Sequence, residues 1–280
     1  MRVGLIGASG FLGRHLRDTL VARGDTVVAA SLRNAPEAAG AVCDCDAVVN
    51  LAGEPIAQRW TPEVKERLHT SRVEAVHAMF DALAQHDRRP SAYVSASAVG
   101  YYPPSETATY TESSAHGNDF LGELCAAWER EAERASSLGM RTAIVRMGVV
   151  LGRDGGALGK LLPVFRNGLG GIVGSGRQWL SWVHVDDATG IVRMVLDGER
   201  GVFNATAPHP VTNAAFTQAL AKTLRRPAFF AVPTFALRLA LGEGAEILLQ
   251  GQRVLPERTL QTGYTFRFAT IDDALRNLAH

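Results

Sequence analysis

The stretch MRVGLIGASGFLGR, residues 1–14, decides the fold of this chain. Residues 2–6 form an apolar run of strand length, Gly7, Gly10 and Gly13 follow at intervals of three, and a helical pattern runs from Phe11 to Arg23. A turn without side chains lets a pyrophosphate approach the main chain, and the N-terminus of the helix attracts that anion. A glycine-rich turn can also be a plain connection, but the strand before it and the helix after it favour dinucleotide binding. The predicted contact residues are Gly7, Ser9, Gly10, Phe11, Leu12 and Gly13.

The composition is that of a globular protein and argues against several classes of function. The chain has 280 residues, of which 46% are hydrophobic and 20% charged, with a formal net charge of +1. Its basic residues are scattered, which argues against a nucleic-acid surface, and no apolar run approaches the ~20 residues of a membrane span. The first strand begins at once, so we expect no signal peptide and a cytoplasmic protein. Three cysteines are too few for a disulfide framework, and we predict no metal site.

Strand-like and helix-like segments alternate along the chain, which predicts an α/β protein with a doubly wound parallel sheet of the Rossmann type. Further strands are predicted at residues 26–30, 46–50 and 141–146, and another begins at 92–94. One long amphipathic helix is predicted from about residue 61 to residue 85, because Pro62 is well placed at its first position.

The end of the second strand indicates which nicotinamide cofactor binds. An NAD-preferring fold usually places an acidic residue there, which holds the ribose hydroxyls and repels a 2′-phosphate. Here Ser31 and Arg33 occupy that place. A hydroxyl and a guanidinium suit a phosphate, which arginine can bind with two parallel hydrogen bonds. Arg33 could also be a solvated loop residue, but we predict NADP(H) rather than NAD.

Small and polar residues also end the next two strands. Leu51, Ala52 and Gly53 would let the chain pass close to an adenosine and its ribose. The segment SASAVGYY, residues 95–102, brings two hydroxyls and two phenols to the point where a strand meets its loop. Ligands bind at the carboxyl ends of strands in such sheets, so we assign Leu51, Ala52, Gly53 and Ser95 to the cofactor.

These motifs resemble those of the epimerase-like branch of the short-chain dehydrogenase/reductases. Within that branch, the chain is similar to an atypical extended-type group that carries a small C-terminal module. The segments that carry the resemblance cover nearly the whole chain: GASGFLG at 7–13, NLAGE at 50–54, RW at 59–60 with SR at 71–72, DFL at 119–121 with WE at 128–129, RMGVVLG at 146–152, GLGG to GSG at 168–176, SWVH at 181–184, and the tail from 246 to 264.

The resemblance implies two parts and further site residues. An NADP-binding Rossmann domain would comprise residues 1–150 with about 183–205, and a smaller substrate-facing part would comprise residues 151–182 with 206–280. The resemblance also implies that Arg72 reaches the cofactor and that Ser97 polarises the substrate.

The chain departs from the wider family at the residues that carry proton transfer. Typical members use a Tyr-x-x-x-Lys pair, in which the phenolate exchanges a proton and the lysine lowers its pKa. Aligned with this pattern, Leu121 replaces the tyrosine and Cys125 replaces the lysine. Ser97, Tyr101 and His184 are the candidate catalytic substitutes. Tyr101 could instead line a pocket wall, and His184 could be a buried hydrogen-bonded strut.

Two hypotheses of function follow. The first is an NADP-dependent oxidoreductase or epimerase that acts on an unidentified small polar carbonyl or sugar-type substrate with a non-standard active site. The second is a catalytically silent NADP(H)-binding redox sensor or regulatory protein. In either case we expect a monomer or homodimer that binds a small molecule, with no nucleic-acid or membrane partner.

Overall fold

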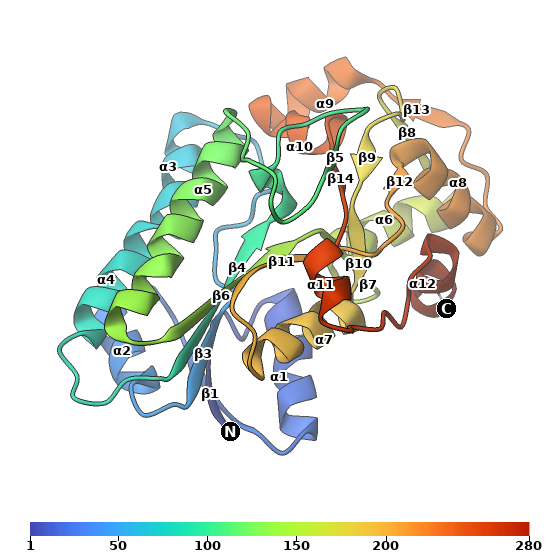
Figure 1. The fold of residues 1–280 in the computed structure, drawn as a ribbon. Coiled ribbons are helices and arrows are strands. Elements are labelled where there is room, and N and C mark those ends of the chain that lie inside the picture. The colour runs from blue at the N-terminus through green and yellow to red at the C-terminus, as the bar shows by residue number, and fades with distance from the viewer. Residues whose placement is uncertain (280) are drawn as a thin grey trace.

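The computed structural model describes residues 1–279, and a six-stranded sheet lies at its centre (Figure 1). The strand order is β11-β6-β4-β3-β1-β2, and every neighbouring pair runs parallel. The strands are β1 (Arg2–Ile6), β2 (Thr26–Ala30), β3 (Ala47–Asn50), β4 (Ala92–Ala98), β6 (Arg141–Met147) and β11 (Gly201–Ala205). The strand order reverses between β1 and β3, and the crevice at such a point is where doubly wound sheets bind ligands.

Helices cover both faces of this sheet, which confirms the predicted fold class. Apolar side chains of α1 (Phe11–Ala22) and α7 (Val185–Leu196) pack on one face in a buried cluster that includes Leu16, Leu20 and Ile191. The other face is covered by α2 (Ala35–Val42), α4 (Glu74–Leu83) and α5 (Phe120–Glu133). The sheet is therefore buried on both sides, as a parallel sheet requires.

A smaller part lies beyond the carboxyl ends of the strands (Figure 1). Four short two-stranded ladders join its segments: β10-β7, β12-β9, β13-β8 and β14-β5. Its own buried cluster includes Leu158, Phe165, Trp182, Phe216 and Leu275. The elements outside the main sheet are β5 (Thr109–Tyr110), β7 (Val149–Gly152), α6 (Gly156–Arg166), β8 (Gly171–Val173), β9 (Trp179–Leu180), β10 (Trp182–His184), β12 (Val211–Thr212), α8 (Asn213–Leu224), β13 (Phe230–Val232), α9 (Thr234–Leu241), α10 (Glu246–Leu249), β14 (Arg253–Val254), α11 (Glu257–Gln261) and α12 (Ile271–Leu278).

The prediction of one helix from residue 61 to residue 85 is wrong. The segment forms two helices, α3 (Pro62–Thr70) and α4 (Glu74–Leu83), with a turn at residues 71–73. The Ser71 hydroxyl donates to the Leu68 carbonyl (3.2 Å) and accepts from the Glu54 amide (3.0 Å). These bonds tie the turn to the loop after β3, and apolar periodicity alone does not reveal such a tie.

No helix among residues 1–279 is long and apolar enough to span a membrane.

Candidate functional site

The glycine loop between β1 and α1 has the shape that the sequence predicts. Gly7 has a φ of +84°, and a Cβ there would lie 2.9 Å from the Ala52 main-chain nitrogen. A Cβ on Gly13 would lie 2.1 Å from the Gly7 carbonyl oxygen, so the helix packs directly against the loop. Gly10 is different, because the nearest atom to its Cβ would be the Gly7 oxygen at 3.3 Å. Gly7 and Gly13 thus serve close backbone packing, whereas Gly10 faces more open space.

The N-terminus of α1 is free to meet an anion. Gly10 is the N-cap, no side chain caps the first turn, and that turn contains no acidic residue. Its amides therefore keep their capacity to bind a negative ligand, and the helix dipole favours one. Ser9 and Gly10 are exposed, whereas Phe11 packs against the glycines at 152, 155 and 156.

At the end of β2, Ser31 and Arg33 are both exposed. The Arg33 amide donates to the Ser31 hydroxyl oxygen (3.4 Å), which holds the two residues in one turn. No carboxylate among residues 1–279 forms a salt bridge with the Arg33 guanidinium. A cation and a hydroxyl are thus available together beside the glycine loop, with no acidic residue between them.

Arg72 lies in the turn between α3 and α4 and reaches the end of β3. Its guanidinium donates to the carbonyl oxygens of Glu54 (2.8 Å) and Leu68 (3.2 Å). A Cβ on Gly53 would lie 2.9 Å from the Arg72 Cζ, so these two residues are in contact. Leu51 and Ala52 are half-buried and lie beside the Gly7 turn. The structure therefore brings the loop after β3, Arg72 and the glycine loop together.

Contrary to the prediction, the two serines of β4 are buried and hydrogen-bonded inside the protein. Ser95 is 1% exposed, and its hydroxyl donates to the Ala96 carbonyl (3.0 Å). Ser97 is 2% exposed, and its hydroxyl donates to Glu129 Oε1 (2.6 Å). Glu129 also forms a buried salt bridge with Arg146 (2.7 Å). Both hydroxyls are therefore already bonded inside the protein, which argues against cofactor contact by Ser95 and substrate contact by Ser97.

The tyrosines after β4 belong to the same buried network. The Tyr102 hydroxyl accepts from Arg146 Nη1 and donates to Asn204 Oδ1, both at 2.8 Å. Burial raises the pKa of Tyr102 to about 12, so its phenol stays protonated at neutral pH. The Arg146 guanidinium carbon lies 3.4 Å from the centroid of the Tyr101 ring. Tyr101 therefore packs on a buried cation, in agreement with the alternative of a structural role.

His184 is a buried strut rather than a base at the site. It is 1% exposed, its Nδ1 accepts from the Asp186 amide (3.0 Å), and its Nε2 lies 3.1 Å from Asn277 Oδ1. Its ring stacks on Phe268 at a centroid distance of 3.9 Å. Burial lowers the pKa of His184, which keeps the imidazole neutral. Ser97 and Tyr101 thus both adjoin the Glu129–Arg146 pair, whereas His184 belongs to a separate cluster with Asn277 and Phe268.

The positions that replace the family's catalytic pair are close to a large cavity. Leu121 and Cys125 both line it. Cys125 is 4% exposed, and burial raises the pKa of its thiol to about 12. A protonated thiol cannot supply the positive charge of a lysine, and leucine has no proton to exchange. Neither side chain therefore replaces the proton donor or the cation of the pair.

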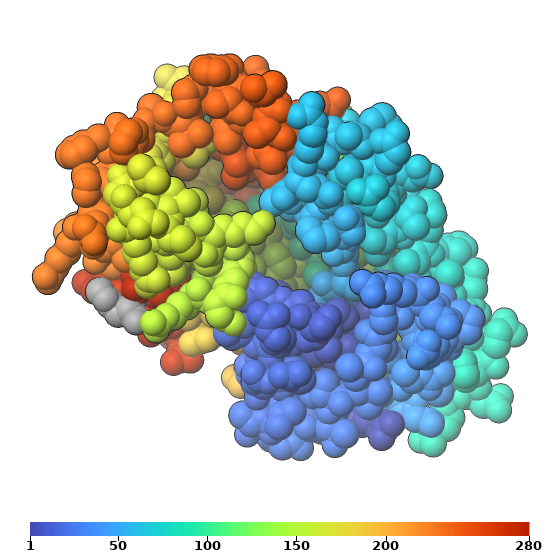
Figure 2. Space-filling view, turned by 180° about the vertical axis from the view of Figure 1, so that it is seen from behind, coloured from blue at the N-terminus to red at the C-terminus, as the bar shows by residue number. Residues whose placement is uncertain are grey.

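The cavity has a volume of about 810 Å³ and lies between the sheet and the smaller part. Figure 2 shows the surface hollowed between the N-terminal segment, the loop around residue 56, α6 and the C-terminal helices. Most of its wall is apolar, which does not match the small polar substrate expected from the sequence. The larger apolar lining residues are Ile56, Trp60, Val99, Phe120, Leu121, Leu124, Trp128, Met147, Val149, Leu151, Leu161, Phe165, Val173, Trp179, Leu180, Phe216, Ile247 and Leu248.

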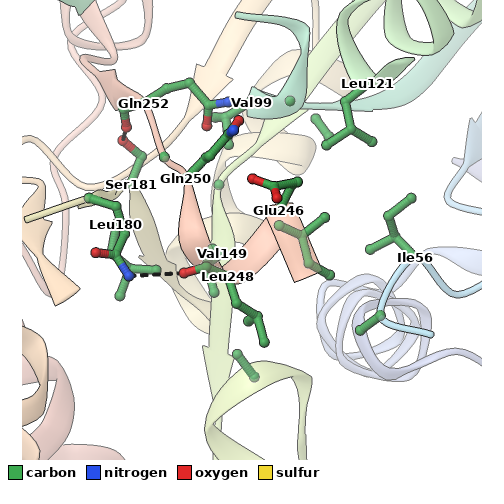
Figure 3. Close-up of a pocket in the computed structure, with 18 of the residues that line it drawn as sticks. Ile56, Val99, Leu121, Val149, Leu180, Ser181, Glu246, Leu248, Gln250 and Gln252 are labelled. Atoms are coloured by element: carbon green, nitrogen blue, oxygen red, sulfur yellow. Dashed lines mark hydrogen bonds between the residues drawn. The ribbon is translucent and has the colours of Figure 1, made fainter. Parts of the chain in front are cut away.

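Two lining residues were not identified from the sequence. Glu246, at the start of α10, projects into the space between Leu121 and Ser181 (Figure 3). Its Oε1 accepts from Arg238 (3.1 Å), and no hydrogen bond to Oε2 is present among residues 1–279. The indole nitrogen of buried Trp128 likewise has no hydrogen-bond partner in this part of the chain. A glutamate in a tail segment and a tryptophan in an amphipathic helix carry no local signal of such a position.

Within the described residues, no group of three or more His, Cys, Asp or Glu side chains is placed to hold a metal ion.

Comparisons with known proteins add the following findings. A model of the NAD dependent epimerase/dehydratase family matches residues 3–206, and a domain of unknown function (DUF1731) matches residues 232–278. The chain is 41% identical over 299 residues to the chloroplastic SDR39U1 homologue of Arabidopsis thaliana, an epimerase family protein, with 99% of this chain and 86% of that one covered. It is 40% identical over 292 residues to human epimerase family protein SDR39U1, with 99% of each covered.

Two solved structures are similar to this chain over its whole length. A crystal structure of the human SDR39U1 protein (isoform 2) with NADPH superposes with a TM-score of 0.94 at 38% identity, covering 100% of this chain and 99% of that chain. The Thermus thermophilus UDP-glucose 4-epimerase in complex with NAD gives a TM-score of 0.81 at 18% identity, covering 100% of this chain and 98% of that chain. The second likeness, at its low identity, shows the fold alone.

Proposed function

The chain belongs to the NAD dependent epimerase/dehydratase family, and we propose that it is an NADP(H)-binding oxidoreductase or epimerase with a non-standard active site. The observation that carries the cofactor choice is the Arg33 guanidinium beside Ser31 at the end of β2, exposed and without a salt bridge in the described part of the chain. A 2′-phosphate carries negative charge, and arginine can bind it with two charge-assisted hydrogen bonds. The NADPH bound to the human relative supports the same choice.

The residues present fit such a cofactor. The glycine loop at 7–13 would hold the pyrophosphate, since Gly10 leaves open space at an uncapped helix N-terminus. Leu51, Ala52 and Gly53 would lie along the adenosine side, with Arg72 behind them. The substrate would bind between the Rossmann domain, residues 1–150 with about 183–205, and the smaller part, residues 151–182 with 206–280. Free cysteines at 43, 45 and 125 fit the expected cytoplasmic location.

When bound, NADPH supplies a hydride to a carbonyl carbon, and a proton must reach the carbonyl oxygen to complete the alcohol. Three carboxyl groups line the cavity. Asp119 caps α5 through the Gly122 amide, and Glu243 pairs with Lys65. Glu246 keeps one oxygen without a hydrogen bond among the described residues. Glu246 also pairs with a cation, Arg238, but only through Oε1. We therefore propose that its second oxygen, Oε2, relays the proton between solvent and the substrate oxygen as a general acid–base.

A second candidate function is a catalytically silent redox sensor or regulatory protein. The replacement of the tyrosine and lysine by Leu121 and Cys125 favours it, because neither can exchange a proton near neutral pH. This alternative shares the cofactor site and differs only in turnover.

Two measurements test the proposal. Isothermal titration calorimetry should show tighter binding of NADPH than of NADH, and a protein that binds neither would overturn it. NADPH absorbance at 340 nm, followed with a panel of aldehydes, ketones and quinones, should then show oxidation with at least one class. Tight NADPH binding without turnover across the panel would favour the sensor.

A further inference from the structure

We propose that the substrate of this cavity is an apolar carbonyl or alcohol compound with one hydrogen-bonding end, and that nucleotide sugars are excluded; this rests on the proposed NADP(H) function. The proposal concerns the space beyond the cofactor loop, where α5, α6, α10 and the loop around residue 56 meet.

The wall of the cavity favours apolar ligands from several directions. Leu121 and Trp128 come from α5, Val149 from β7, Ile56 from the loop after β3, and Ile247 from α10. Each methylene group that leaves water against such a wall contributes about 0.8 kcal/mol. A sugar hydroxyl placed there without a partner costs about 1–3 kcal/mol. The same wall therefore attracts an aliphatic or aromatic body and rejects a polyol.

The charges of the cavity oppose a diphosphate. The lining residues include two cations, Arg72 and Lys160, against three carboxylates, Asp119, Glu243 and Glu246. Arg72 already donates to main-chain carbonyl oxygens at Glu54 and Leu68. Only Lys160 remains without a partner among residues 1–279, and it is exposed. The carboxylates are themselves engaged, since Glu243 pairs with Lys65 and Glu246 with Arg238. A nucleotide sugar would thus bring two negative charges to a wall that offers them one unpartnered cation among the described residues.

Three uncharged polar lining residues lie together at one side of the cavity. In Figure 3, Ser181, Gln250 and Gln252 lie on the side opposite Leu121, with Glu246 between them. Ser181 and Gln252 are tied to the main chain, since the Ser181 hydroxyl donates to the Gln252 carbonyl (2.7 Å) and the Gln252 side chain donates to the Tyr102 carbonyl (3.0 Å). This side can bind one polar end of a ligand while the apolar side holds the rest.

The test compares a neutral apolar probe with a nucleotide sugar on the protein loaded with NADPH. Calorimetry first establishes NADPH binding. N-phenyl-1-naphthylamine is then titrated by its fluorescence, and UDP-glucose by calorimetry. The variant Leu121→Gln places an amide in the wall, and Leu239→Gln makes the same change on α9 at a position that is 74% exposed and does not line the cavity. If Leu121→Gln does not fold, Ile247→Gln from another wall replaces it.

We expect saturable binding of the probe, no heat from UDP-glucose, about tenfold weaker probe binding in Leu121→Gln, and no change in Leu239→Gln. Probe binding that falls equally in both variants would mean surface adsorption and would overturn the proposal. UDP-glucose binding that displaces the probe would overturn it as well. Failure to bind NADPH at the first step would instead contradict the proposed function itself.

Discussion

Replacement of Arg33 by alanine should separate the two nicotinamide cofactors. Arg33 is exposed at the end of β2 and forms no salt bridge with a carboxylate in the described chain, so its removal leaves no buried charge unpaired. The free energy of unfolding should change by less than about 0.5 kcal/mol, as for other surface substitutions. Loss of binding in this variant can therefore be read as loss of a ligand contact.

The size of the effect follows from the two hydrogen bonds that a guanidinium can donate to a phosphate. At an exposed site the pair is expected to contribute about 1.4–2.8 kcal/mol in total. That range corresponds to about a ten- to hundredfold weaker affinity for NADPH. NADH has no 2′-phosphate, so its affinity should remain unchanged.

The assay is calorimetric titration of NADPH and NADH at two ionic strengths. Because Arg33 is exposed, salt should weaken the wild-type preference for NADPH, and the variant should show little of this salt dependence. Arg17→Ala is the matched control, since Arg17 is also exposed and, among residues 1–279, its one salt bridge is to its neighbour Asp18. Equal losses for NADPH and NADH in Arg33→Ala, or none for either, would refute the reasoning.

Gly10→Val should fold but bind neither cofactor, since its side chain would fill the space in front of the helix N-terminus. Gly13→Val should instead fail to fold, because its Cβ would lie 2.1 Å from the Gly7 oxygen. Circular dichroism checks folding and calorimetry checks binding, and a folded Gly13→Val protein would contradict this interpretation. Glu246→Gln should keep NADPH affinity within about twofold but lower the rate of any NADPH oxidation by about a hundredfold or more. An unchanged rate would show that Glu246 takes no part in proton transfer. Burial lowers the pKa of His184 in the folded protein below the ordinary value of about 6.5. As the pH falls below 6.5, His184 is protonated in the unfolded chain before it is protonated in the folded protein, so the free energy of unfolding should decrease. Urea unfolding at pH 7.5 and 5.5 should show a smaller loss in His184→Asn than in the wild type, and equal losses would show that His184 does not titrate in this way.

The sequence by itself determined the architecture and the position of the cofactor loop. Glycine spacing, apolar runs of strand length and the residues at strand ends are local properties, and the main chain responds to them wherever the segment lies. The preference for NADP(H) could be predicted from Ser31 and Arg33 because both residues lie at the end of the same strand. The replacement of the catalytic pair by Leu121 and Cys125 was also visible in the sequence, from the family resemblance.

Only the tertiary structure decided which side chains reach the cavity. Ser97 looked available at a strand end, but its hydroxyl donates to Glu129 on α5, which in turn pairs with Arg146 on β6. Glu246 was not singled out in the sequence, but it enters the cavity opposite α5. Hydrogen-bond partners and cavity walls arise where segments distant in the chain pack together, and the energetic cost of leaving a buried polar group unpaired selects those partners. Periodicity and spacing contain no information about that choice, because it depends on which surfaces meet in three dimensions.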